Sequence, residues 1–272
     1  MPKGGVARRA TAIQQEKAKS PNVLVVDAGN ALYGQPISLQ TQGKAIVDAM
    51  NKLGYQAMAL GDGDFRYGTT VLQERMKEAT FPFLSANVVI SSTGKLFTKA
   101  YTIVTVGGRK IGLIGLTNPE AAKMAAQPYR PIAGKGTPTT APAPSEAIIV
   151  LDPIEAAKSA VAEVSKETNV IIVLSHLGQA KDQQVINAVP GITAVISGKD
   201  RQVVEAIKAA ATDAVVAQSG FDGEMLGILT LEIGSNGRVT KFSGQSKSLT
   251  PEVPDDPTLK ALMDKYKAEI KY

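Results

Sequence analysis

The chain has 272 residues, a formal net charge of +5, and a composition that is 44% hydrophobic and 20% charged. This length suits one large domain or two small ones, and the composition is that of an ordinary globular protein. The sequence has no cysteine for disulfides or thiolate sites, no run of ~20 apolar residues for a membrane span, and no basic, aromatic-interleaved run for nucleic-acid binding.

Helices and strands are predicted to alternate through the first half of the chain. A helix is expected over 6–19. The apolar run 22–27 then ends in Asp27, as in a buried strand that delivers an acidic residue to a loop. Glycines at 107 and 108 join two β-rich runs and predict a hairpin of 101–106 with 110–116. The other elements expected here are helices over 39–53 and 69–78 and strands over 56–60 and 83–89.

The second half begins with a segment rich in proline, glycine and threonine. We expect 134–145 to be a solvated surface loop within one domain, because proline lacks an N–H donor and fixes φ. The α/β order predicts a mixed sheet or two packed sheets flanked by helices. The expected helices are 154–166, 181–188 and 256–272, and the expected strands are 170–174, 192–196, and an antiparallel set of 214–218, 226–233 and 239–243.

Three predicted strand-to-loop junctions carry short polar motifs, Asp27-Ala28-Gly29-Asn30, Gly61-Asp62-Gly63-Asp64 and Gly198-Lys199-Asp200-Arg201. With Gly4-Gly5 and Ser175-His176, they follow the order and spacing of a known family. The chain resembles the N-terminal, calcineurin-like metallophosphoesterase domain of the bacterial 5′-nucleotidases and UDP-sugar hydrolases.

The resemblance implies an α/β fold: a metallophosphoesterase-like sandwich of mixed β-sheets flanked by helices, with 1–272 as a single domain. It implies that the family's first strand and its C-terminal 5′-nucleotidase domain are absent from this sequence. It also implies a periplasmic or extracellular location, although this chain shows no signal peptide.

By resemblance, the family's metal site falls on positions where most of its ligands are replaced. The metal-bridging Asp falls on Asn30, and the two His of the Gly-His-x-His motif fall on Lys199 and Arg201. The catalytic His falls on Gly63, and the acidic residue that orients it falls on Arg66. The expected vestigial site comprises Asp27, Asn30, Asp62, Asp64, His176, Lys199 and Arg201.

The residue types themselves argue against a two-metal centre. One histidine cannot supply several imidazoles, and protonated Lys or Arg has no lone pair for a cation. We therefore predict no bound metal, with Lys199 and Arg201 paired to Asp27, Asp62, Asp64 or Asp200. The alternatives are one divalent cation such as Mn or Zn, held by Asp62 and His176 with Asn30, and an anion pocket at Lys199 and Arg201.

Two further expectations concern single residues. Asp27 is expected to accept hydrogen bonds from loop amides, and Asp62 and Asp64 to pair with Arg66, Lys199 or Arg201. Ser175 is not expected to act as a nucleophile with His176, because adjacent strand residues point to opposite faces.

The sequence thus predicts a catalytically degenerate protein, a pseudoenzyme on a 5′-nucleotidase scaffold, that acts as a binding or assembly module. The alternative is a metal-dependent phosphoesterase with a reduced one-metal site or with ligands from a missing segment or partner. Lack of the first strand would expose a sheet edge, and proteins usually cover such edges. We expect a protein partner or homo-oligomer to cover it, and a small anion as the small ligand.

Overall fold

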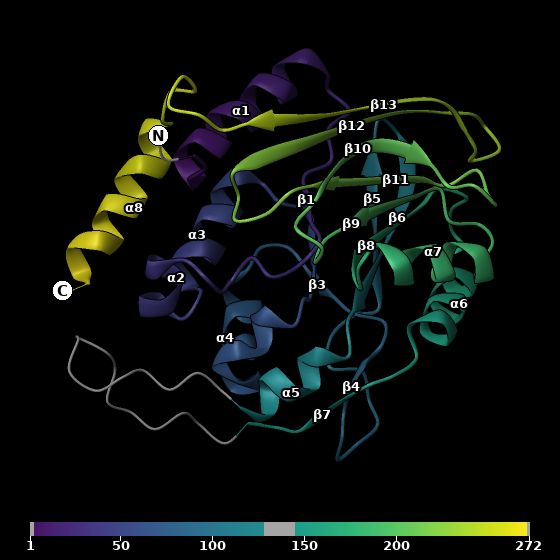
Figure 1. Ribbon diagram of the computed structural model, residues 1–272, viewed down its shortest axis with the longest axis horizontal. Helices are drawn as coiled ribbons and strands as arrows, with labels where there is room; N and C mark the ends of the chain where they lie inside the picture. The colour runs from purple at the N-terminus through teal and green to yellow at the C-terminus, as the bar shows by residue number, and fades with distance from the viewer. Residues whose placement is uncertain (1–2, 128–144, 271–272) are drawn as a thin grey trace.

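A computed structural model describes residues 3–127 and 145–270. Two sheet layers pack face to face, and helices cover their outer sides (Figure 1). One apolar core lies between the two sheet layers, and each sheet layer shares a second core with its helices. This α/β sandwich of mixed sheets confirms the predicted fold class.

The first sheet layer contains three short parallel strands in the order β1 (Val26–Asp27), β2 (Ala57–Ala59) and β3 (Phe83–Leu84). Its outer face is covered by α1 (Val6–Lys19), α3 (Lys44–Leu53) and α8 (Pro257–Glu269), and α1 lies beside α8 (Figure 1). The buried side chains of α3 recur at helical spacing, at positions 45, 46, 49, 50 and 53, which is why this helix packs one face on the sheet.

The second sheet layer has six strands in the order β10-β11-β9-β8-β6-β5. The four central strands are parallel, and the two edge strands are antiparallel to their neighbours. Helices α6 (Pro153–Val164) and α7 (Gln179–Ala188) cover its outer face. The strands are β5 (Tyr101–Val106), β6 (Arg109–Thr117), β8 (Ile171–His176), β9 (Ala194–Ser197), β10 (Val203–Lys208) and β11 (Val215–Ser219).

The remaining elements surround these layers. An antiparallel hairpin of β12 (Met225–Ile233) and β13 (Val239–Ser248) packs beside β10 and β11. A small two-stranded sheet pairs β4 (Val88–Ile90) with β7 (Ile148–Val150). The other helices are α2 (Pro36–Thr41), the 3-10 helix η1 (Gly63–Tyr67), α4 (Thr69–Glu78) and α5 (Glu120–Ala126).

The two sheet layers approach most closely where β6 crosses β3. A Cβ atom placed on Gly115 would lie 2.2 Å from the carbonyl oxygen of Leu84. Only glycine fits at such a backbone approach, so Gly115 is required for sheet packing rather than for nucleotide binding.

Several predicted elements occur, and some differ. The helices expected over 6–19 and 69–78 have those bounds. The helix expected over 39–53 is broken, because Gln42 and Gly43 adopt left-handed backbone with φ of 48° and 82°. The strand expected over 214–218 is not wholly part of an antiparallel set, since β11 pairs with β9 in parallel. The loop expected over 134–145 lies outside the described residues, apart from Ser145.

Candidate functional site

The polar junctions at the ends of β1, β2 and β8 meet in space. The Nε2 atom of His176 lies 3.5 Å from Oδ1 of Asp62, and the Asn30 side-chain amide donates to the same oxygen at 3.4 Å. Asn118, which directly follows β6, donates to Asp62 Oδ1 at 2.6 Å and to the His176 carbonyl at 3.1 Å. The structure therefore brings Asn30, Asp62 and His176 together as predicted. Asn118 was missed, although it follows a buried strand as Asp27 does.

His176 ends β8, and only 3% of its surface is exposed. Its Nδ1 lies 2.8 Å from the carbonyl oxygen of Ala28, so Nδ1 carries the proton and donates it to that acceptor. The Nε2 atom has no hydrogen-bond partner within the described residues. Burial lowers the pKa of His176, which keeps the imidazole neutral, while Lys199 also lowers it and Asp62 raises it.

Asp64 is a buried clamp between two loops. Its carboxylate accepts backbone N–H bonds from Asn30 at 2.8 Å, Leu32 at 3.0 Å and Gly61 at 2.8 Å. Burial raises the pKa of Asp64 to about 7, and these three backbone bonds oppose that rise. Asp64 therefore fixes the relative position of the β1 and β2 loops through the backbone. The expected ion pair between Asp64 and a basic side chain is wrong.

Asn30 uses its oxygen within the protein. Its backbone is left-handed, with φ of 61°, a conformation that Asn tolerates better than most residues. Its Oδ1 accepts the Gly63 N–H at 2.6 Å. A Cβ atom on Gly63 would lie 3.0 Å from that oxygen, so a larger residue at position 63 would push against the Asn30 amide.

The predicted pairing of Lys199 and Arg201 with the site carboxylates is wrong. Arg201 instead donates to Asp222 at 3.0 Å and stacks over the Phe221 ring at 4.2 Å. Lys199 makes no ion pair with any residue that the structure describes. Both residues have left-handed backbone, with φ of 65° and 56°, and this turns their side chains away from the expected partners.

Asp200, between them, accepts the Gln179 N–H at 2.5 Å and so binds the first turn of α7. Arg66 also departs from its expected partners. It donates to the sulfur of Met124 at 2.9 Å and lies over the Tyr33 ring at 5.5 Å, and makes no ion pair with Asp62 or Asp64. The charges of the site loops are thus directed outward or bound to backbone.

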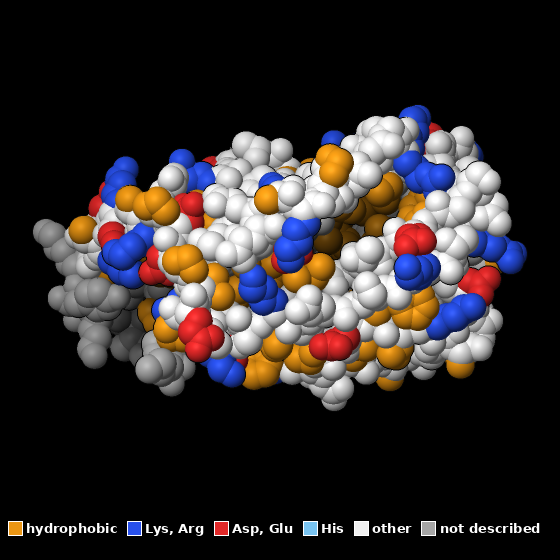
Figure 2. Space-filling model, turned by 90° about the horizontal axis from the view of Figure 1, so that it is seen from above, with side chains coloured by type: hydrophobic (Ala, Val, Ile, Leu, Met, Phe, Trp, Pro, Cys, Tyr) orange, Lys and Arg blue, Asp and Glu red, His pale blue; other side chains and the backbone are white. Residues whose placement is uncertain are grey.

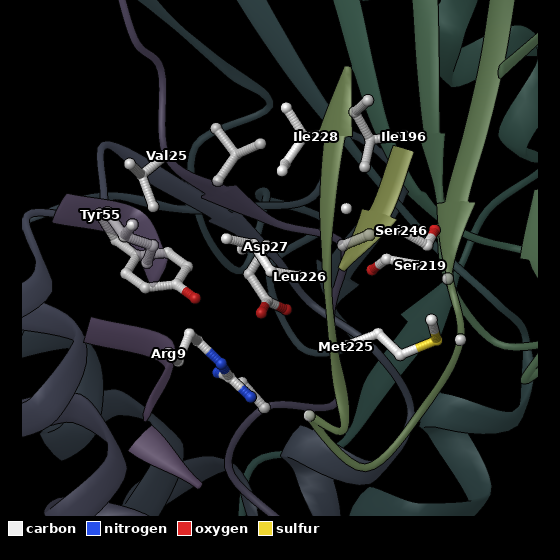
Figure 3. Close-up of a pocket in the computed structure, with 18 of the residues that line it drawn as sticks. Arg9, Val25, Asp27, Tyr55, Ile196, Ser219, Met225, Leu226, Ile228 and Ser246 are labelled. Carbon is white, nitrogen blue, oxygen red and sulfur yellow. The ribbon is translucent and has the colours of Figure 1, made fainter. Parts of the chain in front are cut away.

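Asp27 behaves as predicted for a loop-stabilising residue, since its Oδ1 accepts the Gly29 N–H at 2.9 Å. It also lines a cavity together with Arg9 and Tyr55 (Figure 3). Burial raises the pKa of Asp27, and the positive charge of Arg9 opposes this rise. Arg9 in α1 was missed by the sequence prediction because a lone arginine on a helix gives no local signal of a buried partner.

A second buried carboxylate lies behind the site. Asp182 in α7 accepts hydrogen bonds from Ser175 and, at 2.5 Å, from Ser197. Burial raises its pKa to about 6, and the two hydroxyl bonds oppose the rise. Ser175 therefore points to the α7 side, away from His176, as expected for adjacent strand residues. This arrangement ties β8, β9 and α7 together.

The donor atoms do not fit a two-metal centre. Within residues 3–127 and 145–270, no group of three or more His, Cys, Asp and Glu side chains could hold a metal ion. One imidazole nitrogen and one carboxylate oxygen face each other, while the Asn30 oxygen already accepts an N–H. His176 and Asp62 are the two residues that could contact a single cation.

No protein-family model matches the sequence. Over 290 residues, 98% of this chain, it is 30% identical to a snake venom 5′-nucleotidase of Crotalus adamanteus. The chain spans 46% of that relative's length.

Solved structures give the same result. The fold matches a 5′-nucleotidase precursor from Thermus thermophilus with a TM-score of 0.84 and 29% identity, covering 99% of this chain and 54% of that one. It matches the calcineurin-like phosphoesterase YfkN from Bacillus subtilis with a TM-score of 0.81 and 23% identity, covering 99% and 90%. None of the described helices has both the length and the apolar character needed to cross a bilayer.

Proposed function

This chain is a homologue of the 5′-nucleotidases and has the fold of their metallophosphoesterase domain, and from that premise we propose that it is a catalytically inactive binding module. The proposal rests on one observation: the described residues at the site offer a single imidazole and a single facing carboxylate as donors. Two-metal hydrolysis needs several anionic and imidazole ligands to offset the charge of two cations.

The surroundings of this donor pair support the same conclusion. The Asn30 oxygen is used to bind the Gly63 N–H, and the Asp64 carboxylate is used to bind three backbone N–H groups. The positive charge of Lys199 is close enough to His176 to lower the pKa of that imidazole, and it opposes an incoming cation. These groups hold the loops together without a metal ion.

A test measures metal content and turnover on the same preparation. The chain is purified without chelator, its Mn and Zn content is determined by elemental analysis, and hydrolysis of p-nitrophenyl phosphate and a 5′-nucleotide is followed with added Mn²⁺. We expect less than stoichiometric metal and no turnover above that of a matched Asp62→Asn, His176→Asn double variant. Circular dichroism checks that both proteins are folded.

One observation favours a second candidate, a phosphoesterase that uses one divalent cation. The unpartnered Nε2 of His176 and the Oδ1 of Asp62 are two lone-pair donors that face each other. Under this alternative, the protein binds one equivalent of Mn or Zn, turns over substrate, and loses both properties in the double variant. That result would replace the inactive module as the proposed function.

A further inference from the structure

A large cavity lies between the first sheet and the β12–β13 hairpin. Its volume is about 1640 Å³, and side chains of β1, β9, β12 and α1 line it (Figure 3). The molecular face seen in Figure 2 is hollowed, with hydrophobic side chains along the hollow. Much of the lining is apolar, including Val23, Val26, Ile172, Ile196, Leu226 and Ile228.

Two strand edges border this cavity without a neighbour. Strand β1 ends the order β1-β2-β3, and β12 pairs only with β13 among the described strands. Residues of both strands line the same cavity, while β13 contributes only Ser246. Unpaired N–H and C=O groups on both sides form a site into which a single strand can hydrogen-bond on each of its edges.

The two edges belong to one layer of the fold. Next to β1, Val25 packs in the core under the helices, while Leu24 and Val26 pack in the core between the sheets. In β12, Leu226 packs with the helix-side core, while Leu229 packs between the sheets. This shared alternation places β1 and β12 in one interrupted sheet layer, with the gap between them.

Side chains beside the gap are more exposed than those in the complete sheet. Every residue of β8 is buried, whereas no residue of β1 or β12 is buried. Apolar strand residues with both faces inside a sandwich are usually covered, since burying apolar surface contributes about 25 cal/mol per Å². The exposed stripe therefore has the composition of a core strand's neighbours.

We propose that this cavity accepts one extended, apolar segment of a partner protein, which adds as a strand between β1 and β12. The helix-side wall contains Ile13, Ile46 and Met263, and the opposite wall contains Ile172 and Ile196. A strand between two apolar walls needs apolar side chains on both faces, so the segment is a near-continuous run of Val, Ile and Leu of about six to nine residues. This deepens the binding role proposed above but rests on the cavity alone.

Charge selects one end of the segment. Lys199 lines the loop end of the cavity and has no ion-pair partner in the part of the chain that the structure describes, whereas Arg201 is paired with Asp222. Arg9 interacts with Asp27 at the same end. The uncompensated positive charge of Lys199 favours an acidic residue at the segment end that lies beside these loops.

The test uses labelled synthetic peptides and the folded chain. The probe is a fluorescein-labelled peptide with roughly seven consecutive Val, Ile and Leu residues, then Asp, between soluble Gly/Ser flanks. One control replaces its central residue by Pro, which removes an N–H donor, and another replaces Asp by Lys. We expect saturable one-to-one binding by anisotropy, weakened about tenfold or more by Pro and several-fold by Lys.

Protein variants locate the site. Ile228→Lys is expected to abolish binding, and Lys199→Glu is expected to reverse the preference for Asp over Lys, whereas Lys181→Glu, on exposed α7, leaves both unchanged. Hydrogen exchange adds a readout on the wild-type chain, because strand addition protects the amides of β1 and β12.

Three outcomes would overturn the proposal: no saturable binding by folded wild-type protein, equal binding of the Pro peptide, or a stable dimer whose β1 and β12 amides are already protected by a second copy. Metal-dependent turnover would overturn the inactive-module function but would leave peptide binding unaffected, so the two failures are distinguishable.

Discussion

The Nε2 atom of His176 faces Oδ1 of Asp62 at 3.5 Å, and neither atom brings a proton to the contact in the neutral imidazole. The proton of the ring is on Nδ1, which donates to the Ala28 carbonyl at 2.8 Å. Asp62 in turn accepts its shortest hydrogen bond from Asn118. The imidazole is therefore held by burial and by the Ala28 carbonyl, and its contact with Asp62 contributes little to stability.

This relationship predicts different effects for two substitutions of His176. His176→Ala leaves the buried Ala28 carbonyl without its donor and opens a cavity, so we expect a loss of about 2–3 kcal/mol in the free energy of unfolding. His176→Asn places an amide N–H near the former Nδ1 and should recover about 1 kcal/mol of that loss. Urea denaturation measures both values. Equal destabilisation by the two variants would show that the bond to Ala28 is not what holds this residue.

Asn30→Asp tests whether negative charge alone can create a cation site. The new carboxylate still accepts the Gly63 N–H but no longer donates to Asp62, and it brings a second negative charge close to that residue. We expect destabilisation of about 1 kcal/mol without metal, measured as a lower melting temperature.

Divalent cations should then distinguish this variant from the wild type. Added Mn²⁺ or Zn²⁺ should raise the melting temperature of Asn30→Asp, since a ligand that binds only the folded state stabilises it, and should leave the wild type unchanged. Lys199→Glu provides a matched control for added negative charge outside the Asn30–Asp62 pair. An equal metal-induced rise in the wild type would indicate a native cation site.

Asp182 predicts a pH-dependent term in stability. Burial raises its folded-state pKa to about 6 from an ordinary value of 3.8, and the nearby Asp200 also raises it. The folded state therefore holds the proton more tightly than the unfolded state. The stability from protonated Asp182 is fully present below about pH 4 and is lost as pH rises to about 6.

The matched variant is Asp182→Asn, which keeps the shape of the side chain but does not titrate. We expect the wild-type free energy of unfolding to fall relative to this variant by up to about 3 kcal/mol between pH 4 and 6, because one pKa unit corresponds to about 1.4 kcal/mol. Above pH 6 the difference should be flat. Denaturant titrations at several pH values check this, and a difference that rises over the same interval would contradict the burial of Asp182.

Local patterns were sufficient to predict many elements. Helices α1 and α4 follow from periodic apolar residues after Gly5 and Gly68, and the β5–β6 hairpin follows from its two glycines. The strand expected over 83–89 was only partly correct. It divides into β3 and β4 because Ser85 and Asn87 turn inward to hydrogen-bond Thr117, a residue 30 or more positions away.

The site was predicted in position but not in its pairing. Composition and motif order place Asn30, Asp62 and His176 together, because loops at the ends of neighbouring strands meet. The partners of Lys199 and Arg201 depend on left-handed backbone at both residues, and Lys and Arg give no sequence signal for it. The cavity between β1 and β12 is likewise a property of strand order in space, which a single sequence does not display.

The left-handed backbone at Lys199 predicts stabilisation by glycine. A side chain at φ of 65° costs roughly 1–2 kcal/mol relative to ordinary backbone, and glycine removes this cost while losing about 0.5–1 kcal/mol through the greater freedom of the unfolded chain. We expect Lys199→Gly to raise the free energy of unfolding by up to about 1 kcal/mol. Lys199→Ala removes the same charge but keeps the Cβ atom, so it should change stability little. A gain of equal size in both variants, measured by urea denaturation, would attribute the effect to the lost charge instead of the backbone.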